Sequence, residues 1–106
     1  MKINKENIKN FVKYLNKLIN ISLQYVCYGE IVPTLHFVFH DIDLSLAYKC
    51  TEVCISDFDE DEVLIEFYID DILAGDICLK YGQEISTEHD EGYAEEESMF
   101  GIHIKS

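Results

Sequence analysis

The sequence predicts an α+β fold, in which one N-terminal amphipathic helix packs on an antiparallel, meander-like sheet of five to seven strands. Three observations predict it. Apolar residues recur at helical spacing in the first segment, they alternate at strand spacing in the segments that follow, and the connections are short. With 106 residues, the chain is expected to form a single domain over residues 1–106.

The first segment is predicted to be a helix over residues 5–19. Asn4 suits the N-cap position, and Ile3 and Ile8 suit the two positions of a hydrophobic staple around it. Asn20 is expected to end the helix in a left-handed turn. The apolar stripe that would face the core comprises Ile8, Phe11, Val12, Leu15, Leu18 and Ile19.

The rest of the chain is predicted to form strands joined by short connections. Alternation, or enrichment in β-branched and aromatic residues, marks the segments 21–28, 34–40, 41–48, 50–56, 63–69, 72–81 and 98–105. Asp70 and Asp71 fit a two-residue hairpin turn, because aspartate tolerates the left-handed conformation. Residues 82–97 are predicted to be a long polar loop.

The chain is strongly acidic: 21 acidic residues stand against eight lysines and no arginine, which gives a formal net charge of −13. Residues 1–17 hold five of the lysines and one acid, Glu6, so this segment carries +4 and the remainder carries −17. A body with this charge repels nucleic acid and anionic membranes and attracts basic proteins.

Four of the N-terminal lysines are spaced four residues apart and share one face of the predicted helix. They are Lys5, Lys9, Lys13 and Lys17. Two interpretations stay open. The lysines are either a solvated outer face, or a stripe that offsets the acidic body or contacts an anionic part of a partner.

The acidic residues gather in two clusters, within residues 57–62 and 84–97. Their twelve carboxylates repel one another, and a partner rich in lysine and arginine would relieve this repulsion. We therefore expect a protein-binding surface, with plain solvation of charged loops as the alternative. Phe58 and Tyr93 are the candidate apolar anchors. The residues predicted to contact the partner are Asp57, Phe58, Asp59, Glu60, Asp61, Glu62, Glu88, Asp90, Glu91, Tyr93, Glu95, Glu96 and Glu97.

Calcium binding is not predicted for the first cluster. Asp57, Asp59 and Asp61 match the first three ligand positions of an EF-hand loop. Glu62, however, stands where that loop needs glycine, and Tyr68 stands where it needs a bidentate glutamate.

Zinc binding is not predicted either. The candidate ligand pairs His36 with His40 and Cys50 with Cys54 are each four residues apart. On strands this spacing separates two residues by roughly 13 Å, which is too far for either pair to chelate a metal alone. We expect neither a metal nor another cofactor.

A small thiol or metal-dependent enzyme is an alternative, because cysteine and histidine both occur. The acidic body disfavours it, since nearby negative charge raises the pKa of a thiol. The chain also has no Gly-rich phosphate loop, nucleophile elbow or dinucleotide-binding motif. We expect no enzymatic activity.

The lysines of the first segment interrupt any signal-peptide run, and no stretch approaches the ~18 apolar residues of a membrane span. We expect a cytoplasmic protein in which the cysteines stay reduced. These are Cys27, Cys50, Cys54 and Cys78.

A strongly acidic chain of this length without catalytic motifs resembles bacterial toxin-immunity proteins, in particular those of contact-dependent growth inhibition systems. The opening MKINKENIKNFVKYLNKLIN also has the Lys-, Asn- and Ile-rich composition of AT-rich mobile genes. The resemblance implies a heterodimeric complex with one cognate basic toxin, often a nuclease, whose active site the immunity protein covers. The same features resemble phage-encoded DNA mimics, including anti-restriction and anti-CRISPR proteins.

Overall fold

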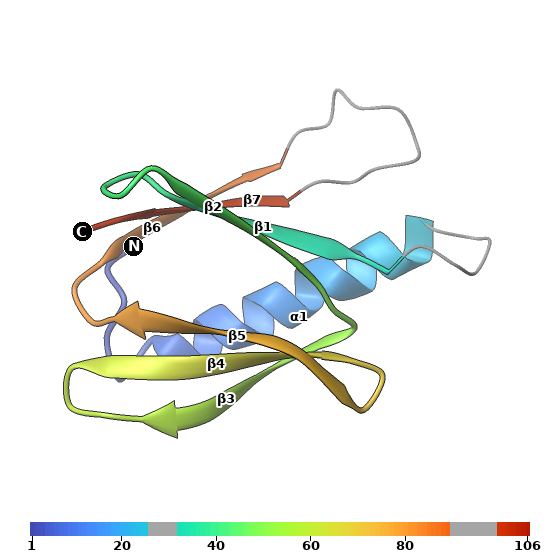
Figure 1. Ribbon diagram of the computed structural model, residues 1–106, viewed down its shortest axis with the longest axis horizontal. Coiled ribbons are helices and arrows are strands. Elements are labelled where there is room, and N and C mark those ends of the chain that lie inside the picture. The colour runs from blue at the N-terminus through green and yellow to red at the C-terminus, as the bar shows by residue number, and fades with distance from the viewer. Residues whose placement is uncertain (26–31, 90–99) are drawn as a thin grey trace.

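The computed structural model of the chain describes residues 1–25, 32–89 and 100–106 (Figure 1). The α+β prediction is confirmed: within these residues, one N-terminal helix packs on seven mostly antiparallel strands. The elements are α1 (Ile8–Tyr25), β1 (Thr34–Phe39), β2 (Leu44–Lys49), β3 (Glu52–Phe58), β4 (Glu62–Ile69), β5 (Ile72–Lys80), β6 (Glu84–His89) and β7 (Phe100–Lys105).

The strands form two sheets and not one continuous meander. The four-stranded sheet has the order β2-β1-β7-β6, and the three-stranded sheet has the order β3-β4-β5. β1 and β7 run parallel. The chain leaves the first sheet after β2, builds the second sheet, and then returns for β6 and β7. Figure 1 shows α1 running between the two sheets in this view.

The predicted cap and staple agree with the structure, although α1 begins at Ile8 and not at residue 5, after a turn over residues 5–7. Asn4 Oδ1 accepts hydrogen bonds of 2.9 Å from the backbone N–H groups of Glu6 and Asn7, so Asn4 caps the first turn. Ile3 and Ile8 are fully buried, as the predicted hydrophobic staple requires.

The end of α1 differs from the prediction. The helix continues past Asn20 to Tyr25, so the predicted strand over 21–28 is wrong for its described part. Leu18 and Ser22 are both buried and lie four residues apart, which extends the buried stripe of the helix. This tertiary burial outweighs the β-propensity of the segment.

Two further boundaries are corrected by the structure. The strand predicted over 41–48 begins only at Leu44, because Asp43 adopts a φ of +49° and turns the chain. Part of the predicted polar loop is strand β6, which pairs with β7 and buries Ile85. Pairing along both edges of β6 supplies the stability that its polar sequence does not predict.

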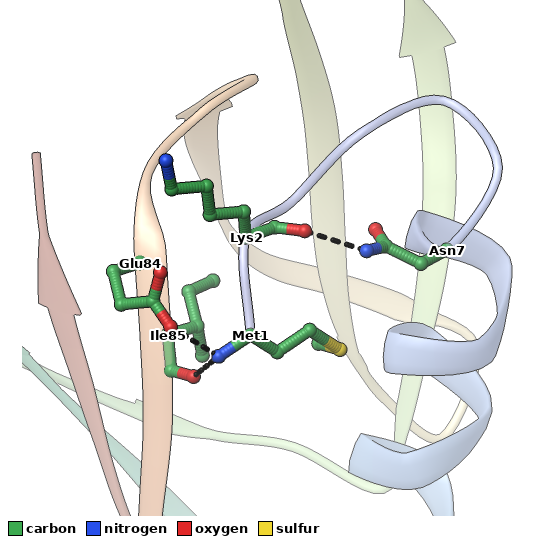
Figure 2. A network of polar contacts seen from close by, with 5 residues as sticks. All are labelled: Met1, Lys2, Asn7, Glu84 and Ile85. Atoms are coloured by element: carbon green, nitrogen blue, oxygen red, sulfur yellow. Dashed lines mark hydrogen bonds and ion pairs between the residues drawn. The ribbon is translucent and has the colours of Figure 1, made fainter.

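Residues 1–3 provide the second of these pairings (Figure 2). Lys2 lies opposite Glu84, and the N–H of Ile85 donates to the carbonyl of Met1 at 2.8 Å. The Met1 ammonium lies 2.5 Å from Glu84 Oε1 and lowers the pKa of that carboxyl group. The outer edge of β6 is therefore covered at the start of the strand.

The two sheets pack together through aromatic side chains. Tyr48 of β2 stacks on Phe67 of β4 at a centroid distance of 4.3 Å, and Phe37 of β1 meets Phe67 edge-to-face at 5.5 Å. A Cβ atom at Gly75 would lie 2.9 Å from the Tyr48 ring, so only glycine allows this approach. The Tyr48 hydroxyl also donates to the carbonyl of Asp76 at 2.9 Å, which fixes the ring.

α1 connects the two sheets on the other side of the core. The Asn16 amide donates to the carbonyl of Val53 in β3 at 2.8 Å, and Asn16 Oδ1 accepts from the Val53 N–H at 2.9 Å. The Tyr14 hydroxyl lies 3.2 Å from Thr87 Oγ1 of β6. The Asn16 side chain thus takes the place of a neighbouring strand at the β3 edge.

Replacing Asn16 with alanine is expected to lower the free energy of unfolding by about 1–3 kcal/mol, because both backbone groups of Val53 lose their partner. Asn20→Ala is the matched control, since Asn20 is exposed on the same helix and alanine favours helix formation. Urea denaturation of both variants measures the difference. Equal stability of the two variants would contradict this role of Asn16.

Candidate protein-binding site

The first predicted cluster forms the turn between β3 and β4. The Asp59 N–H donates to the Glu62 carbonyl, and Asp59 Oδ1 accepts from the Glu60 N–H, both at 2.8 Å. The Asp61 carbonyl accepts from the Tyr81 N–H at 3.0 Å, which ties the turn to the end of β5. The exposed members of the cluster are Asp57, Phe58, Asp59, Glu60 and Asp61.

Phe58 emerges at the end of β3 beside this turn. It lies opposite buried Val63, but 46% of Phe58 is exposed to solvent. An exposed aromatic ring with carboxylates around it has the arrangement expected of an interface anchor.

The second predicted cluster lies mostly outside the described residues, which do not include Asp90, Glu91, Tyr93, Glu95, Glu96 and Glu97. Glu88 belongs to β6, opposite Gly101 of β7. Figure 1 shows the end of β6 pointing away from the β3–β4 turn. The structure therefore does not bring Glu88 next to the first cluster.

The turn instead continues into a larger acidic surface. Because Val63, Ile65 and Phe67 of β4 are buried, the alternate residues of the three-stranded sheet face outward. Residues 52–80 hold ten acids against a single basic residue, Lys80. We call these ten acids the acidic face: Glu52, Asp57, Asp59, Glu60, Asp61, Glu62, Glu66, Asp70, Asp71 and Asp76.

A hollow of about 360 Å³ opens in the acidic face. Its lining residues are Glu52, Cys54, Ile55, Ser56, Glu66, Tyr68 and Asp71. Desolvation and the neighbouring Glu66 carboxylate raise the pKa of Tyr68, so its hydroxyl stays protonated at neutral pH. Carboxylates beside an aromatic ring suit a guanidinium or ammonium group, which they bind by charge-assisted hydrogen bonds and by cation–π attraction.

Two carboxylates of the acidic face lie directly opposite each other, Glu66 on β4 and Asp76 on β5. The hydrogen bond from Tyr81 to Asp61 sets the alternation of this ladder and makes Glu66 and Asp76 a non-hydrogen-bonded pair. Such pairs have Cα atoms about 4.5 Å apart, and like charges at this position destabilise a sheet.

Within the described part of the chain, no carboxylate of the acidic face forms an ion pair. The one ion pair among the described residues joins the Met1 ammonium to Glu84, outside this surface. Lys5 in the turn before α1 is exposed, as are three lysines on the helix, and none of the four forms an ion pair with a described acid. The three on the helix are Lys9, Lys13 and Lys17. Lys80, opposite Glu62, is therefore the one cation of this sheet that can offset the repulsion, and it forms no ion pair there.

Metal-ligating side chains do not converge in the described residues, where no group of three or more His, Cys, Asp or Glu could hold an ion. His40 contacts His103 instead, with Nε2 2.7 Å from Nδ1 and the rings stacked. The acidic turn is flanked by β3 and β4, whereas an EF-hand loop is flanked by helices.

The described thiols are poor candidates for nucleophiles. Burial raises the pKa of Cys50 to about 12. Desolvation also raises the pKa of Cys54, together with a hydrogen bond to Glu52, and that of Cys78, together with Glu62. A catalytic thiol needs the opposite shift.

The buried Cys50 predicts a loss of stability at alkaline pH. Its thiol ionises near pH 9.0 in the unfolded chain but only near 12 in the fold. The folded state therefore holds the proton more tightly, and this stabilisation is complete below pH 9 and declines above it. Between those two values, the free energy of unfolding should fall by about 1.4 kcal/mol per pH unit from this group.

The measurement compares wild type and Cys50→Ala by urea denaturation from pH 7 to 11. At pH 7, wild type should have the higher free energy of unfolding, because alanine leaves a cavity in the core. Above pH 9 the free energies of unfolding of the two proteins should approach each other. Wild type loses stability there through Cys50, and the variant has no thiol at this position to ionise. Parallel pH curves for the two proteins would contradict the raised pKa of Cys50.

Comparison of the chain with protein-family models, with curated proteins and with solved structures found no significant match. Among the described residues, no helix has both the length and the apolar character needed to cross a membrane.

Sequence reasoning missed Glu52, Glu66 and Asp76. The alternation within residues 63–69 already places Glu66 on the polar side of its strand. The sequence does not reveal the strand register, and it is the register that brings these three carboxylates from three strands onto one surface.

Proposed function

We propose that this chain is an immunity protein that binds a cognate basic toxin domain, with a nuclease as the expected class, and covers its active site. The observation that carries the proposal is the acidic face, with ten acids against Lys80 and no ion pair among its described side chains. A nuclease cleft binds phosphates with lysine and arginine, and carboxylates can take the place of those phosphates.

Binding of a basic partner would relieve a repulsion that the fold now tolerates. A cation placed between Glu66 and Asp76 would turn an unfavourable pair into a favourable contact. The hollow beside Tyr68 would hold an arginine or lysine side chain, and Phe58 would bury its exposed ring. The predicted contacts within residues 88–97 remain part of the proposal.

Long-range attraction would also speed association. Steered encounters reach about 10⁸–10⁹ M⁻¹s⁻¹ at low salt, against 10⁵–10⁶ for neutral surfaces. Fast capture suits a protein that must neutralise a toxin before the toxin acts.

The test is a rescue of growth by co-expression. The C-terminal domain of the reading frame immediately upstream of this gene is expressed in a bacterial host, with and without this protein. Rescue together with co-purification supports the proposal, and an acid-to-amide variant of the acidic face should rescue less well.

Toxicity without rescue would overturn the proposal. The DNA-mimic alternative then takes its place, and competition between this protein and duplex DNA for a DNA-binding effector tests it. A toxic domain that is not a nuclease would leave the immunity function intact and change only the expected toxin class.

A further inference from the structure

At three of the four outer sheet edges, other parts of the described chain bind some of the outward backbone groups. Residues 1–3 pair along β6, and Asn16 of α1 binds the edge of β3. On β5, the Tyr48 hydroxyl binds the carbonyl of Asp76 at 2.9 Å, and Gln83 Oε1 accepts from the last N–H of the strand at 2.8 Å. Backbone groups that are already bound are not available for pairing with another chain.

The fourth edge, β2, is open. The N–H of Cys50 donates to the carbonyl of Pro33 at 2.9 Å, which sets the alternation of the β1–β2 ladder. Every second residue of β2 therefore directs its N–H and C=O away from β1, and these groups have no partner among the described residues. The residues concerned are Ser45, Ala47 and Lys49, and all three are exposed.

We propose that a second copy of this chain pairs along this edge, with β2 antiparallel to β2 across a two-fold axis. The two four-stranded sheets would then merge into one sheet of eight strands. The inference goes beyond the immunity function, because it assigns a separate surface and a separate partner.

Charge favours a second copy at this position. Each chain carries −13, so two copies repel over most of their surfaces. β1, β2 and β7 contain no acidic residue, whereas the ten acids of the acidic face belong to the other sheet and its turns. Of the four outer sheet edges, β2 is therefore the one with no acid in its strand, although Asp41 and Asp43 lie in the turn before it. The acidic faces stay free for another partner.

One register uses all the open backbone groups. It places Ala47 opposite Ala47 of the second copy and Ser45 opposite Lys49, so no like charges face each other. On the inner side, Leu46 meets Tyr48, two partly exposed apolar side chains. β2 contains no proline, and its one lysine lies at the end of the strand.

The test is the molar mass in solution, by sedimentation or light scattering. At about 100 µM chain, which is about 100-fold above a micromolar Kd, wild type should have twice the 12.3 kDa chain mass. Added salt should strengthen this dimer, because it screens repulsion between the two acidic chains. The same salt should weaken the toxin complex, so failure of one proposal is distinguishable from failure of the other.

Charge exchange at Ala47 tests the register. Ala47→Glu and Ala47→Lys should each be folded monomers, because each places two like charges in direct opposition. An equimolar mixture of the two should recover the dimer. His36→Glu is the control, since His36 pairs with Ala47 from the covered side and should leave the dimer intact.

A wild-type chain that keeps the single-chain mass at this concentration and moderate salt overturns the proposal, whether or not the variants fold. A dimer that survives both Ala47 variants also overturns it. If wild type is monomeric but Ala47→Glu weakens toxin binding, the edge serves the toxin and not a second copy.

Discussion

Replacing Phe67 with alanine is expected to lower the free energy of unfolding by about 3–5 kcal/mol. Phe67 is fully buried on β4, stacks on Tyr48 of β2 at 4.3 Å and meets Phe37 of β1 at 5.5 Å. It therefore joins the two sheets, and its loss removes apolar burial together with two aromatic contacts. Each such contact contributes about 0.5–1.5 kcal/mol beyond burial.

Leu64→Ala is the matched control for this prediction. Leu64 lies on the same strand three residues away, but on the outer side and only partly buried. Its truncation should cost about 1 kcal/mol or less. Urea denaturation followed by circular dichroism gives both values, and an equal loss for the two variants would mean that the sheets do not pack through Phe67.

The fold class could be predicted because local pattern and tertiary burial agree in most elements. In β4 and β5, the strand alternation matches the buried side, and at Asn4 the cap residue matches the helix start. The prediction failed where tertiary contacts decide. Residues 21–25 have β-type composition but continue α1, since Ser22 extends its buried stripe.

The two-sheet arrangement could not be predicted for a related reason. The polar sequence of β6 predicts a loop. In the structure this segment is a strand, which pairs with β7 on one side and, at its start, with residues 1–3 on the other. The parallel β1–β7 pair likewise joins segments more than 60 residues apart. No local pattern carries information on such a pairing.

The candidate site was predicted in part. The clustering of acids within 57–62 is visible in the sequence, and the structure exposes most of that cluster as a turn. The contribution of Glu52, Glu66 and Asp76 depends on strand register, which the sequence leaves open. The unexpected result is that two carboxylates of the sheet, Glu66 and Asp76, lie directly opposite each other.

The double variant Glu52→Gln and Glu66→Gln is expected to weaken binding of the toxin domain by about 30- to 700-fold. This range corresponds to about 2–4 kcal/mol for two hydrogen bonds to charged groups that lose their anionic acceptor. Both carboxylates line the hollow of the acidic face, so the proposed arginine or lysine of the partner would lose two acceptors at once. The expectation depends on the proposed function and is measured by calorimetry or surface plasmon resonance.

The matched control is Glu6→Gln with Asp43→Asn, which removes the same two charges from exposed positions outside the acidic face. Asparagine tolerates the φ of +49° at position 43, so the control should fold normally. If only net charge matters, both double variants should slow association equally and change its salt dependence alike. If the hollow binds a partner side chain, only the first variant should dissociate faster, because lost contacts act mainly on the dissociation rate. If both double variants lose the same binding affinity, the acidic face acts only through long-range attraction, and the hollow does not bind a side chain of the partner.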